Sequence, residues 1–326
     1  MASIQKDVSL KYFSNYRIGG RTKYFLEVSN LLELKEGLAK WKKISEILPI
    51  FILGAGTNVL ISDKGFDGLV IHPNIKFIKE TPSTTSASSL QASSEQVISA
   101  GAGVLIEDLL AFCIENSLSG LEWAGGLPGT LGGAVRGNAG AFRGEIKDNI
   151  VEVTSLDIKT QQIKKRSIRD CRFDYRSGVF KSGDGEGEII IQAVLNLIKG
   201  DKRDVENQIK DKIEYRRERH PLEYPNIGSI FKNIPVKKVP KKLLEQLKDS
   251  IKDDPFPILP TAKLLALAGL KGKRVEGAMV SQKHPNFIVN LGRATSEDVQ
   301  KLIYQIKEII KDKYGIELEE EITVLR

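Results

Sequence analysis

Cysteine is scarce in this chain, with Cys113 and Cys171 as the two examples among 326 residues. Two cysteines cannot build a disulfide framework or a cysteine-based metal cluster. Cys113 lies in helical register with Ile106, Leu109 and Leu110, so we expect it to pack in a core rather than to do chemistry. The scarcity is typical of proteins from a reducing compartment.

Long apolar runs and an apolar leader are also missing. No stretch of about 18 apolar residues occurs, so no membrane-spanning helix is expected. The opening residues MASIQKD contain no apolar segment of the kind that secretory signals carry. Hydrophobic residues make up 41% and charged residues 28% of the chain, as in ordinary globular enzymes. We therefore expect a soluble cytoplasmic protein with no membrane partner.

Positive charge is in excess, with a formal net charge of +7 and an isoelectric point of about 9.1. Such a balance favours anionic partners, such as nucleic acid, acidic lipid or a phosphorylated small molecule. The lysines are mixed with acidic residues, so a solvated basic surface explains most of the excess. No aromatic or helix-turn-helix recognition element accompanies the charge, and we expect no nucleic-acid partner.

Short β-rich runs alternate with helical runs along the chain, which predicts an α+β protein. We expect three parts, covering residues 1–73, 74–200 and 201–326. The expected strands cover residues 24–28, 50–53, 69–71, 151–158, 189–198 and 316–325. The expected helices cover residues 31–48, 106–116, 203–219 and a segment that ends at Gly315. Ser and Thr make up more than half of residues 81–96, which indicates a loop between strands.

The last expected helix has the clearest local signals. Thr295 or Ser296 can cap its N-terminus, and Glu297 and Asp298 lie in its positive first turn. One apolar stripe at helical spacing follows, formed by Val299, Leu302, Ile303, Ile306, Ile309 and Ile310.

A first glycine-rich segment follows the expected strand 50–53 and consists of Gly54, Ala55, Gly56, Thr57 and Asn58. Glycine adopts positive φ and leaves no side chain between the amide groups and a ligand, so successive N–H groups can surround an anion. The third glycine of the nicotinamide-binding fingerprint is missing. The pattern is equally typical of a plain turn and of a pyrophosphate site.

A second segment holds eight glycines between Gly120 and Gly140. It is too apolar for a flexible linker, because Leu121, Trp123, Leu127 and Leu131 lie within it. A main-chain surface beneath a large planar cofactor explains the absence of side chains over so long a span. A glycine-rich packed corner is the alternative.

Both segments resemble the FAD-binding core of the UDP-N-acetylenolpyruvoylglucosamine reductase family, whose fold is the vanillyl-alcohol-oxidase-like flavoprotein fold. The resemblance lies in LGAGTN at 53–58, GLEWAGGLPGTLGGAV at 120–135 and NAGAF at 138–142. Further motifs occur in the order of the family at residues 15–20, 173–176, 221–233, 268–272, 283–290 and 315–318.

The resemblance implies a two-part FAD-binding module followed by a smaller α+β substrate-binding domain. It also implies that NADPH reduces FAD, which then reduces the enolpyruvyl group of a UDP-sugar to give UDP-N-acetylmuramate for peptidoglycan. Attachment of FAD would be non-covalent, because His72, His220 and His284 all lie outside the glycine segments. The implied FAD contacts are Gly54, Ala55, Gly56, Thr57, Asn58, Gly125, Gly126, Pro128, Gly129, Thr130, Gly132, Gly133, Asn138, Ala139, Gly140 and Arg176.

Three catalytic residues are implied by the resemblance: Arg176, Ser229 and Glu321. A guanidinium can stabilise the enolate that forms when hydride adds to the enol ether. A hydroxyl can protonate the strongly basic carbon. Strand alternation over residues 316–325 favours Glu320 as the buried carboxylate, whereas the family pattern favours Glu321. We follow the pattern and keep Glu320 as the alternative.

The UDP group is expected to contact basic and neutral polar residues, namely Arg216, Arg219, Tyr224, Lys232, Asn233 and Lys283. Three features depart from the family pattern. Arg219 stands where lysine is common, Phe142 replaces a commoner tyrosine, and residues 236–260 form a longer basic connection. The chain lacks the tyrosine-bearing lid insertion, so it resembles the shorter branch of the family.

Two other functions compete with this interpretation. A carbohydrate oxidase of the same flavoprotein fold would react slowly with NADPH and quickly with oxygen. A basic nucleic-acid-binding protein would be colourless when purified, whereas a flavoprotein is yellow. The oligomeric state is left open by the sequence, and a monomer is compatible with it.

Overall fold

The computed structural model describes residues 2–45, 47–81 and 95–326, and the chain forms two compact units. The first unit consists of Met1–Lys6, Tyr24–Ala55 and Gly68–Arg216, and the second consists of Asp7–Lys23, Gly56–Asp67 and Arg217–Arg326. No helix in the described part of the chain is long and apolar enough to cross a membrane. The three-part division of the sequence at residues 73 and 200 stays a prediction.

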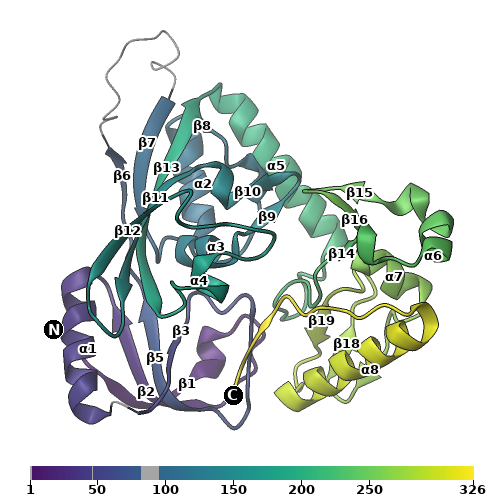
Figure 1. The fold of residues 1–326 in the computed structure, drawn as a ribbon, viewed down its shortest axis with the longest axis horizontal. Helices are drawn as coiled ribbons and strands as arrows, with labels where there is room; N and C mark the ends of the chain where they lie inside the picture. The colour runs from purple at the N-terminus through teal and green to yellow at the C-terminus, as the bar shows by residue number, and fades with distance from the viewer. Residues whose placement is uncertain (1, 46, 82–94) are drawn as a thin grey trace. The chain divides into compact units, whose positions relative to one another are not determined.

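A four-stranded sheet contributes to the first unit, in the order β1-β2-β5-β3. Its strands are β1 (Gln5–Ser9), β2 (Arg21–Val28), β3 (Ile50–Ile52) and β5 (Phe66–Pro73). Strand β3 pairs in parallel with β5. Helix α1 (Leu31–Ile44) lies against this sheet (Figure 1), and its Leu34 and Leu38 share one core with Leu26 and Leu69.

Helix α1 is shorter than the sequence predicts. Asn30 caps its start, because the Asn30 side chain accepts a hydrogen bond from the Glu33 amide at 2.9 Å. The helix ends at Ile44 rather than at Leu48, since Ser45 has an extended backbone with φ −160° and ψ 139°. The apolar pattern extends past this break, which is why periodicity alone overestimated the length.

The larger sheet of the first unit has antiparallel neighbours in the order β12-β11-β13-β7-β6, and β8 also pairs with β13. The strands are β6 (Ile78–Thr81), β7 (Glu95–Gly101), β8 (Leu118–Ser119), β11 (Ile150–Asp157), β12 (Ile163–Ser167) and β13 (Glu188–Lys199). Thr81, Glu95 and Gln96 of the expected loop therefore belong to strands, and residues 82–94 of that loop lie outside the described residues.

Helices cover this sheet and build the main core of the first unit. They are α2 (Ile106–Glu115), α3 (Leu131–Gly137), α4 (Val179–Ser182) and the start of α5 (Lys202–Arg219). Shorter elements are η3 (Glu122–Ala124), β9 (Gly140–Ala141), β10 (Gly144–Glu145) and η4 (Ile146–Asp148). Cys113 on α2 is buried among Leu109, Leu110 and Leu118, so its expected place in a core is confirmed. Burial raises the pKa of its thiol to about 12.

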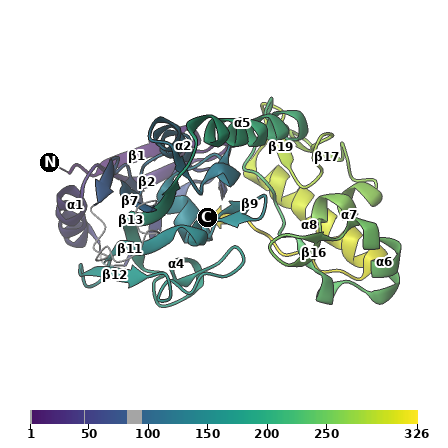
Figure 2. The same ribbon diagram turned by 90° about the horizontal axis from the view of Figure 1, so that it is seen from above.

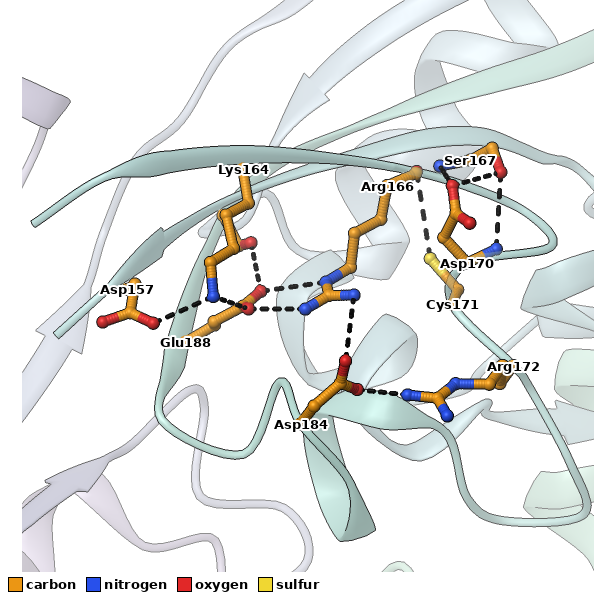
Figure 3. Close-up of polar contacts among 10 residues, drawn as sticks. Asp157, Lys164, Arg166, Ser167, Asp170, Cys171, Arg172, Asp184 and Glu188 are labelled. Carbon is orange, nitrogen blue, oxygen red and sulfur yellow. Dashed lines mark hydrogen bonds and ion pairs between the residues drawn. The ribbon is translucent and has the colours of Figure 1, made fainter. Parts of the chain in front are cut away.

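A buried carboxylate ties β12 to β13 in the first unit (Figure 3). The Glu188 side chain has no exposed surface, and it accepts hydrogen bonds from Ser155 at 2.6 Å, Lys164 at 2.9 Å and Arg166 at 2.7 Å. Burial by itself raises the pKa of Glu188, but these donors outweigh burial and lower the pKa to about 2. The network fixes the end of β12, from which the chain runs to Arg176.

The second unit packs helices against short sheets. Its elements are η1 (Leu10–Phe13), β4 (Val59–Ile61), β14 (Ile234–Pro235), η5 (Val236–Lys238), α6 (Lys241–Gln246), η6 (Lys248–Ser250), β15 (Lys252–Asp253), β16 (Pro257–Leu259), α7 (Thr261–Leu267), β17 (Arg274–Val275), β18 (Ala278–Val280), β19 (Ile288–Asn290), α8 (Ser296–Tyr314) and β20 (Thr323–Leu325). The sheets have the orders β14-β16-β15 and β17-β18-β19, and β20 pairs in parallel with β4.

Helix α8, which is visible in Figure 2, confirms the local signals in the sequence. The Thr295 and Asp298 side chains form a reciprocal capping box, and Gly315 ends the helix with φ +66°. The predicted apolar stripe is buried in the core of this unit, except that Ile309 is partly buried. The helix packs against β17 and β18.

The basic connection 236–260 is amphipathic, and its apolar residues belong to the same core. Val239, Leu243 and Leu247 are buried there, while the lysines around α6 are exposed. Residues that extend the core in this way give the connection a structural role.

The long C-terminal strand expected over residues 316–325 is wrong in its extent. Only β20 forms a regular strand, and Glu320 makes an isolated antiparallel bridge with Phe231. The chain therefore changes its pairing partner between residues 320 and 323, and the period-two burial pattern does not continue across this change.

Candidate functional site

The two glycine segments meet within the first unit. A Cβ atom placed on Gly54 would lie 2.8 Å from Oγ1 of Thr130, which caps helix α3. The amide groups of Gly54 and Ala55 have no hydrogen-bond partner among the described residues. These amides can therefore donate to a ligand that lies beside Thr130.

Gly56 and Asn58 fall in the second unit and contact protein there. Gly56 has φ +63°, and a Cβ atom on it would lie 2.0 Å from the carbonyl oxygen of Phe13. The Asn58 side chain donates to the carbonyl of Glu321 at 3.2 Å. Close packing by itself therefore requires glycine at position 56.

Several glycines of the second segment also serve packing. A Cβ atom on Gly125 would lie 2.5 Å from the carbonyl oxygen of Ile209 in α5, and one on Gly132 would lie 2.9 Å from the Cβ of Ala102. The packed-corner interpretation of the sequence is correct for these two positions.

Two other glycines of the segment are uncovered. Apart from the helix's own backbone and the chain neighbours, no described atom lies within 4 Å of a Cβ atom added to Gly137. For Gly133 the nearest such atom is Oγ1 of Thr130 at 3.4 Å. Gly133 and Gly137 are four residues apart on α3, so they lie on one side of the helix. This side presents bare main chain, which a planar group can approach closely.

Asn138, in contrast, uses its side chain within the fold. It ends α3 in the left-handed conformation with φ +42°. Its amide nitrogen donates to Glu145 and to the carbonyl of Asp174, both at 3.0 Å, and its amide oxygen accepts from the Lys147 amide at 3.3 Å. A ligand at this position would therefore meet main chain rather than the Asn138 side chain.

Arg176 is held against the second glycine segment. Its guanidinium donates to the carbonyls of Asn138 at 3.3 Å and Gly140 at 2.5 Å, and it lies 5.2 Å from the ring centroid of Tyr175. The backbone of Arg176 has φ +53°, which a non-glycine residue rarely adopts. The structure thus brings the predicted catalytic arginine to the predicted cofactor segment.

Arg216 is a buried cation in the same unit. The residue is 8% exposed, its Nε donates to the carbonyl of Gly125 at 2.8 Å, and its guanidinium lies over the Phe142 ring. Its Nη2 atom has no partner among the described residues. Burial lowers the pKa of Arg216 to about 10. A buried guanidinium without an anion is costly, so this position suits a negatively charged ligand.

Ser229 and Glu321 lie on adjacent segments of the second unit. The Glu321 amide donates to the carbonyl of Ile230, the residue after Ser229, at 2.8 Å. Gly228 precedes Ser229 with φ +81°, and no described atom other than those of its chain neighbours lies within 4 Å of a Cβ atom added to it. No described side chain therefore blocks this side of Gly228, next to the serine.

The two acidic residues before Glu321 in the sequence, Glu319 and Glu320, form ion pairs. Glu320 pairs with Lys307 of α8 at 2.9 Å, and Glu319 pairs with Lys232. The Glu320 carboxylate thus has a structural partner on α8. Which of the two glutamates acts in chemistry stays a prediction.

The expected UDP-binding residues other than Arg216 belong to the second unit, where some already contact protein. Lys283 pairs with Glu223 at 3.3 Å, and the amide oxygen of Asn233 accepts from the Thr261 amide at 3.2 Å. Tyr224 is 40% exposed, and Arg219 is the last residue of α5. Their contacts with a nucleotide stay a prediction.

Two family models match separate parts of the chain. Residues 39–164 match an FAD binding domain, and residues 220–325 match the C-terminal domain of UDP-N-acetylenolpyruvoylglucosamine reductase. The UDP-N-acetylenolpyruvoylglucosamine reductase of Caldicellulosiruptor saccharolyticus is 38% identical over 98% of this chain and 91% of its own length. The chain belongs to the UDP-N-acetylenolpyruvoylglucosamine reductase family.

Other members of the family support the assignment. The reductase of Lachnoclostridium phytofermentans is 33% identical over 97% of this chain and 91% of its own length. The crystal structure of UDP-N-acetylenolpyruvylglucosamine reductase from Thermus caldophilus superposes with a TM-score of 0.74 at 26% identity and covers all of both chains. The expected α+β fold with an FAD-binding module is confirmed.

Proposed function

We propose that this protein catalyses the NADPH-dependent reduction of UDP-N-acetylenolpyruvoylglucosamine to UDP-N-acetylmuramate, with non-covalently bound FAD, in peptidoglycan precursor synthesis. The observation that carries the proposal is family membership over nearly the whole chain, with the FAD-binding and C-terminal models both matched. The geometry of the first unit supports binding of the cofactor, and the geometry of the second unit supports a proton transfer from Ser229.

The residues of the first unit fit a flavin dinucleotide. The uncovered side of α3 at Gly133 and Gly137 can accept a planar ring, and the amides of Gly54 and Ala55 can bind phosphate oxygens. Arg216, which the sequence assigned to the UDP group, provides a positive charge for a pyrophosphate through its Nη2 atom, which has no partner among the described residues. The other sequence-based contacts are retained in the proposal, with Asn138 contributing its main chain. Gly125 and Gly132 serve packing instead, and Gly137 is added to the set.

Non-covalent attachment is supported by the placement of the histidines. His72 lies near the cofactor segments in the sequence, but its Nδ1 lies 2.8 Å from the Leu53 carbonyl and its ring stacks on Phe25. His220 and His284 pack with Phe287 in the second unit.

Neighbouring glycines of α3 allow a matched test of the flavin position. A Gly133→Ala change should leave the FAD-free protein as stable or up to about 1 kcal/mol more stable, because alanine favours a helix. It should weaken FAD binding about tenfold or more, since overpacking costs roughly 1–3 kcal/mol. Gly132→Ala should instead lower the melting temperature, because its Cβ would press on Ala102.

Flavin titration and thermal unfolding of both variants make this measurement. Unchanged FAD affinity in the Gly133→Ala protein, at unchanged stability, would remove the uncovered side of α3 from the flavin site.

FAD, when bound, would supply the hydride chemistry between NADPH and the enolpyruvyl double bond. Hydride addition leaves negative charge on the adjacent carbon and its carboxylate, and Arg176 would stabilise that charge through charge-assisted hydrogen bonds. The two carbonyls that bind the guanidinium fix its orientation in advance. Ser229 would then donate its hydroxyl proton to the carbon, and Glu321 would serve as the carboxyl group of the site.

Two adjacent glutamates give a matched test of the carboxyl group. Glu321→Gln should reduce turnover roughly 10²–10⁴-fold, the range typical of a lost acid or base. Glu320→Gln removes a partly exposed ion pair with Lys307, so it should cost at most about 1 kcal/mol of stability and leave turnover nearly unchanged. Steady-state rates and urea unfolding of both variants measure this, and the reverse order of rates would assign the role to Glu320.

Anaerobic stopped-flow mixing tests the function itself. NADPH should bleach the flavin absorbance, and the enolpyruvyl UDP-sugar should then restore it faster than oxygen does. Slow bleaching by NADPH together with fast recovery in air would instead indicate an oxidase. A purified protein that neither contains nor binds FAD would contradict both.

A further inference from the structure

The main chain that follows Ser229 is held by an asparagine from a distant part of the sequence. The Ile230 amide donates to the carbonyl of Asn286 at 2.8 Å, and the Phe231 amide donates to Oδ1 of Asn286 at 3.1 Å. The Nδ2 atom of Asn286 donates back to the carbonyl of Phe231 at 2.8 Å. With the bond from the Glu321 amide to the Ile230 carbonyl, every main-chain polar group of residues 230 and 231 has a partner.

The carboxamide of Asn286 takes the place that a neighbouring strand would have. An amide side chain carries one acceptor and a donor, so it can make the same reciprocal pair of hydrogen bonds as a residue in an antiparallel ladder. Asn286 is 3% exposed, and its carboxamide therefore bonds to this segment without competition from water. The segment lies between Asn286 on one side and residues 319–321 on the other.

We propose that Asn286 is a positioning residue for Ser229, and that it fixes the serine hydroxyl for proton transfer to the substrate carbon. The inference rests on the proposed function. Asn286 acts through the main chain of Ile230 and Phe231, and it does not touch the reacting atoms.

A positioning role affects the two half-reactions differently. Reduction of the flavin by NADPH needs no proton from Ser229, whereas reduction of the enolpyruvyl group does. Displacement of a reacting group by about 1 Å can slow a step roughly 100-fold. Loss of the Asn286 hydrogen bonds should therefore slow the second half-reaction and leave the first near the wild-type rate.

The isosteric variant Asn286→Asp tests this with a pH signature. An ionised carboxylate only accepts hydrogen bonds, so it cannot donate to the Phe231 carbonyl. A protonated carboxyl group has one donor and one acceptor and can restore both bonds, and burial raises the pKa of such a group. Relative to the wild type at the same pH, the second half-reaction should be slowed roughly 100-fold at high pH and should recover as the pH falls.

Dividing the rate of the variant by the rate of the wild type at the same pH cancels the effects of the other titratable groups, because both proteins contain them. Those on the contacting segments are Lys232, Glu319, Glu320, Glu321, Lys283 and His284. Burial lowers the pKa of His284 to about 4, so the measurement is best made above that value.

Two further variants keep the test decisive. Asn286→Ala removes the bonds without introducing a charge, so it should slow the second half-reaction at every pH with no recovery. Asn290→Asp is the control, because Asn290 is also 3% exposed and binds main chain of the same unit, donating to Tyr16 at 3.0 Å and accepting from Gly292 at 2.8 Å. It should change the stability without slowing one half-reaction more than the other.

Stopped-flow rates of the two half-reactions, with the melting temperature and FAD content of each variant, give the result. Selective slowing in both Asn286 variants, with recovery only in Asn286→Asp, supports the proposal. Equal slowing of both half-reactions, no slowing, or the same pattern in Asn290→Asp overturns it. If wild-type enzyme reduced by NADPH does not react with the enolpyruvyl sugar, the proposed function has failed instead.

Discussion

Replacement of Ser229 by alanine is expected to slow the reoxidation of reduced enzyme by the enolpyruvyl UDP-sugar roughly 10²–10⁴-fold, the range for loss of a general acid. Flavin reduction by NADPH should stay within about threefold of the wild-type rate, which corresponds to a change of less than about 1 kcal/mol in the activation free energy. The physical reason is that only the second half-reaction requires a proton on carbon. Anaerobic stopped-flow measurement of each half-reaction gives the two rates.

Ser281 offers a control in the same unit. It is 3% exposed, and its hydroxyl oxygen accepts from the amides of Lys283 at 3.1 Å and His284 at 3.2 Å. Ser281→Ala should therefore lower the stability without slowing one half-reaction more than the other. If both half-reactions of the Ser229→Ala protein stay fast, Ser229 is not the proton donor.

Replacement of Arg176 by alanine is expected to slow the same second half-reaction roughly 10²–10³-fold, as the loss of one donor to a developing oxyanion does. Arg176→Lys should recover little of the rate, because an ammonium group cannot reproduce the planar fork that binds two carbonyls and a carboxylate. Stopped-flow rates and the FAD content of the purified variants measure the effect.

Arg172 is the matched control for Arg176. Both arginines have positive φ, 43° and 53°, so alanine meets the same backbone strain at each position. The Arg172 side chain is 63% exposed and pairs with Asp184, and its replacement should leave both half-reactions intact (Figure 3). A selective loss of FAD from the Arg176→Ala protein would place Arg176 in cofactor binding rather than in catalysis.

The glycine segments show where sequence reasoning reached its limit. The sequence predicted main chain against a cofactor in the stretch from Gly120 to Gly140, with a glycine-rich packed corner as the alternative. In the structure Ile209 and Ala102 occupy the space that a Cβ atom on Gly125 or Gly132 would need. The corresponding space at Gly133 and Gly137 is not occupied by other described residues at less than 3.4 Å. Glycine permits close approach by protein and by ligand alike, so only the neighbours in space distinguish the two uses.

The acidic C-terminal segment shows the same limit. Alternation along the chain selected Glu320, and the family pattern selected Glu321. The ion pair of Glu320 with Lys307 and the switch of pairing partner after residue 320 are long-range features that alternation cannot contain. Asn286 received no role from the sequence for a related reason, since its partner Phe231 is 55 residues away.

What the sequence determined by itself was local or carried by ordered motifs. The capping residues, apolar stripe and Gly315 predicted helix α8, because those signals act within a few residues of one another. The ordered glycine motifs indicated the flavoprotein family. The tertiary structure alone decided which glycines pack against protein, that Glu320 pairs with Lys307, that Nη2 of buried Arg216 has no partner among the described residues, and that Asn286 holds the chain beside Ser229. Each of these depends on atoms that folding brings together from distant parts of the chain, where no local pattern records them.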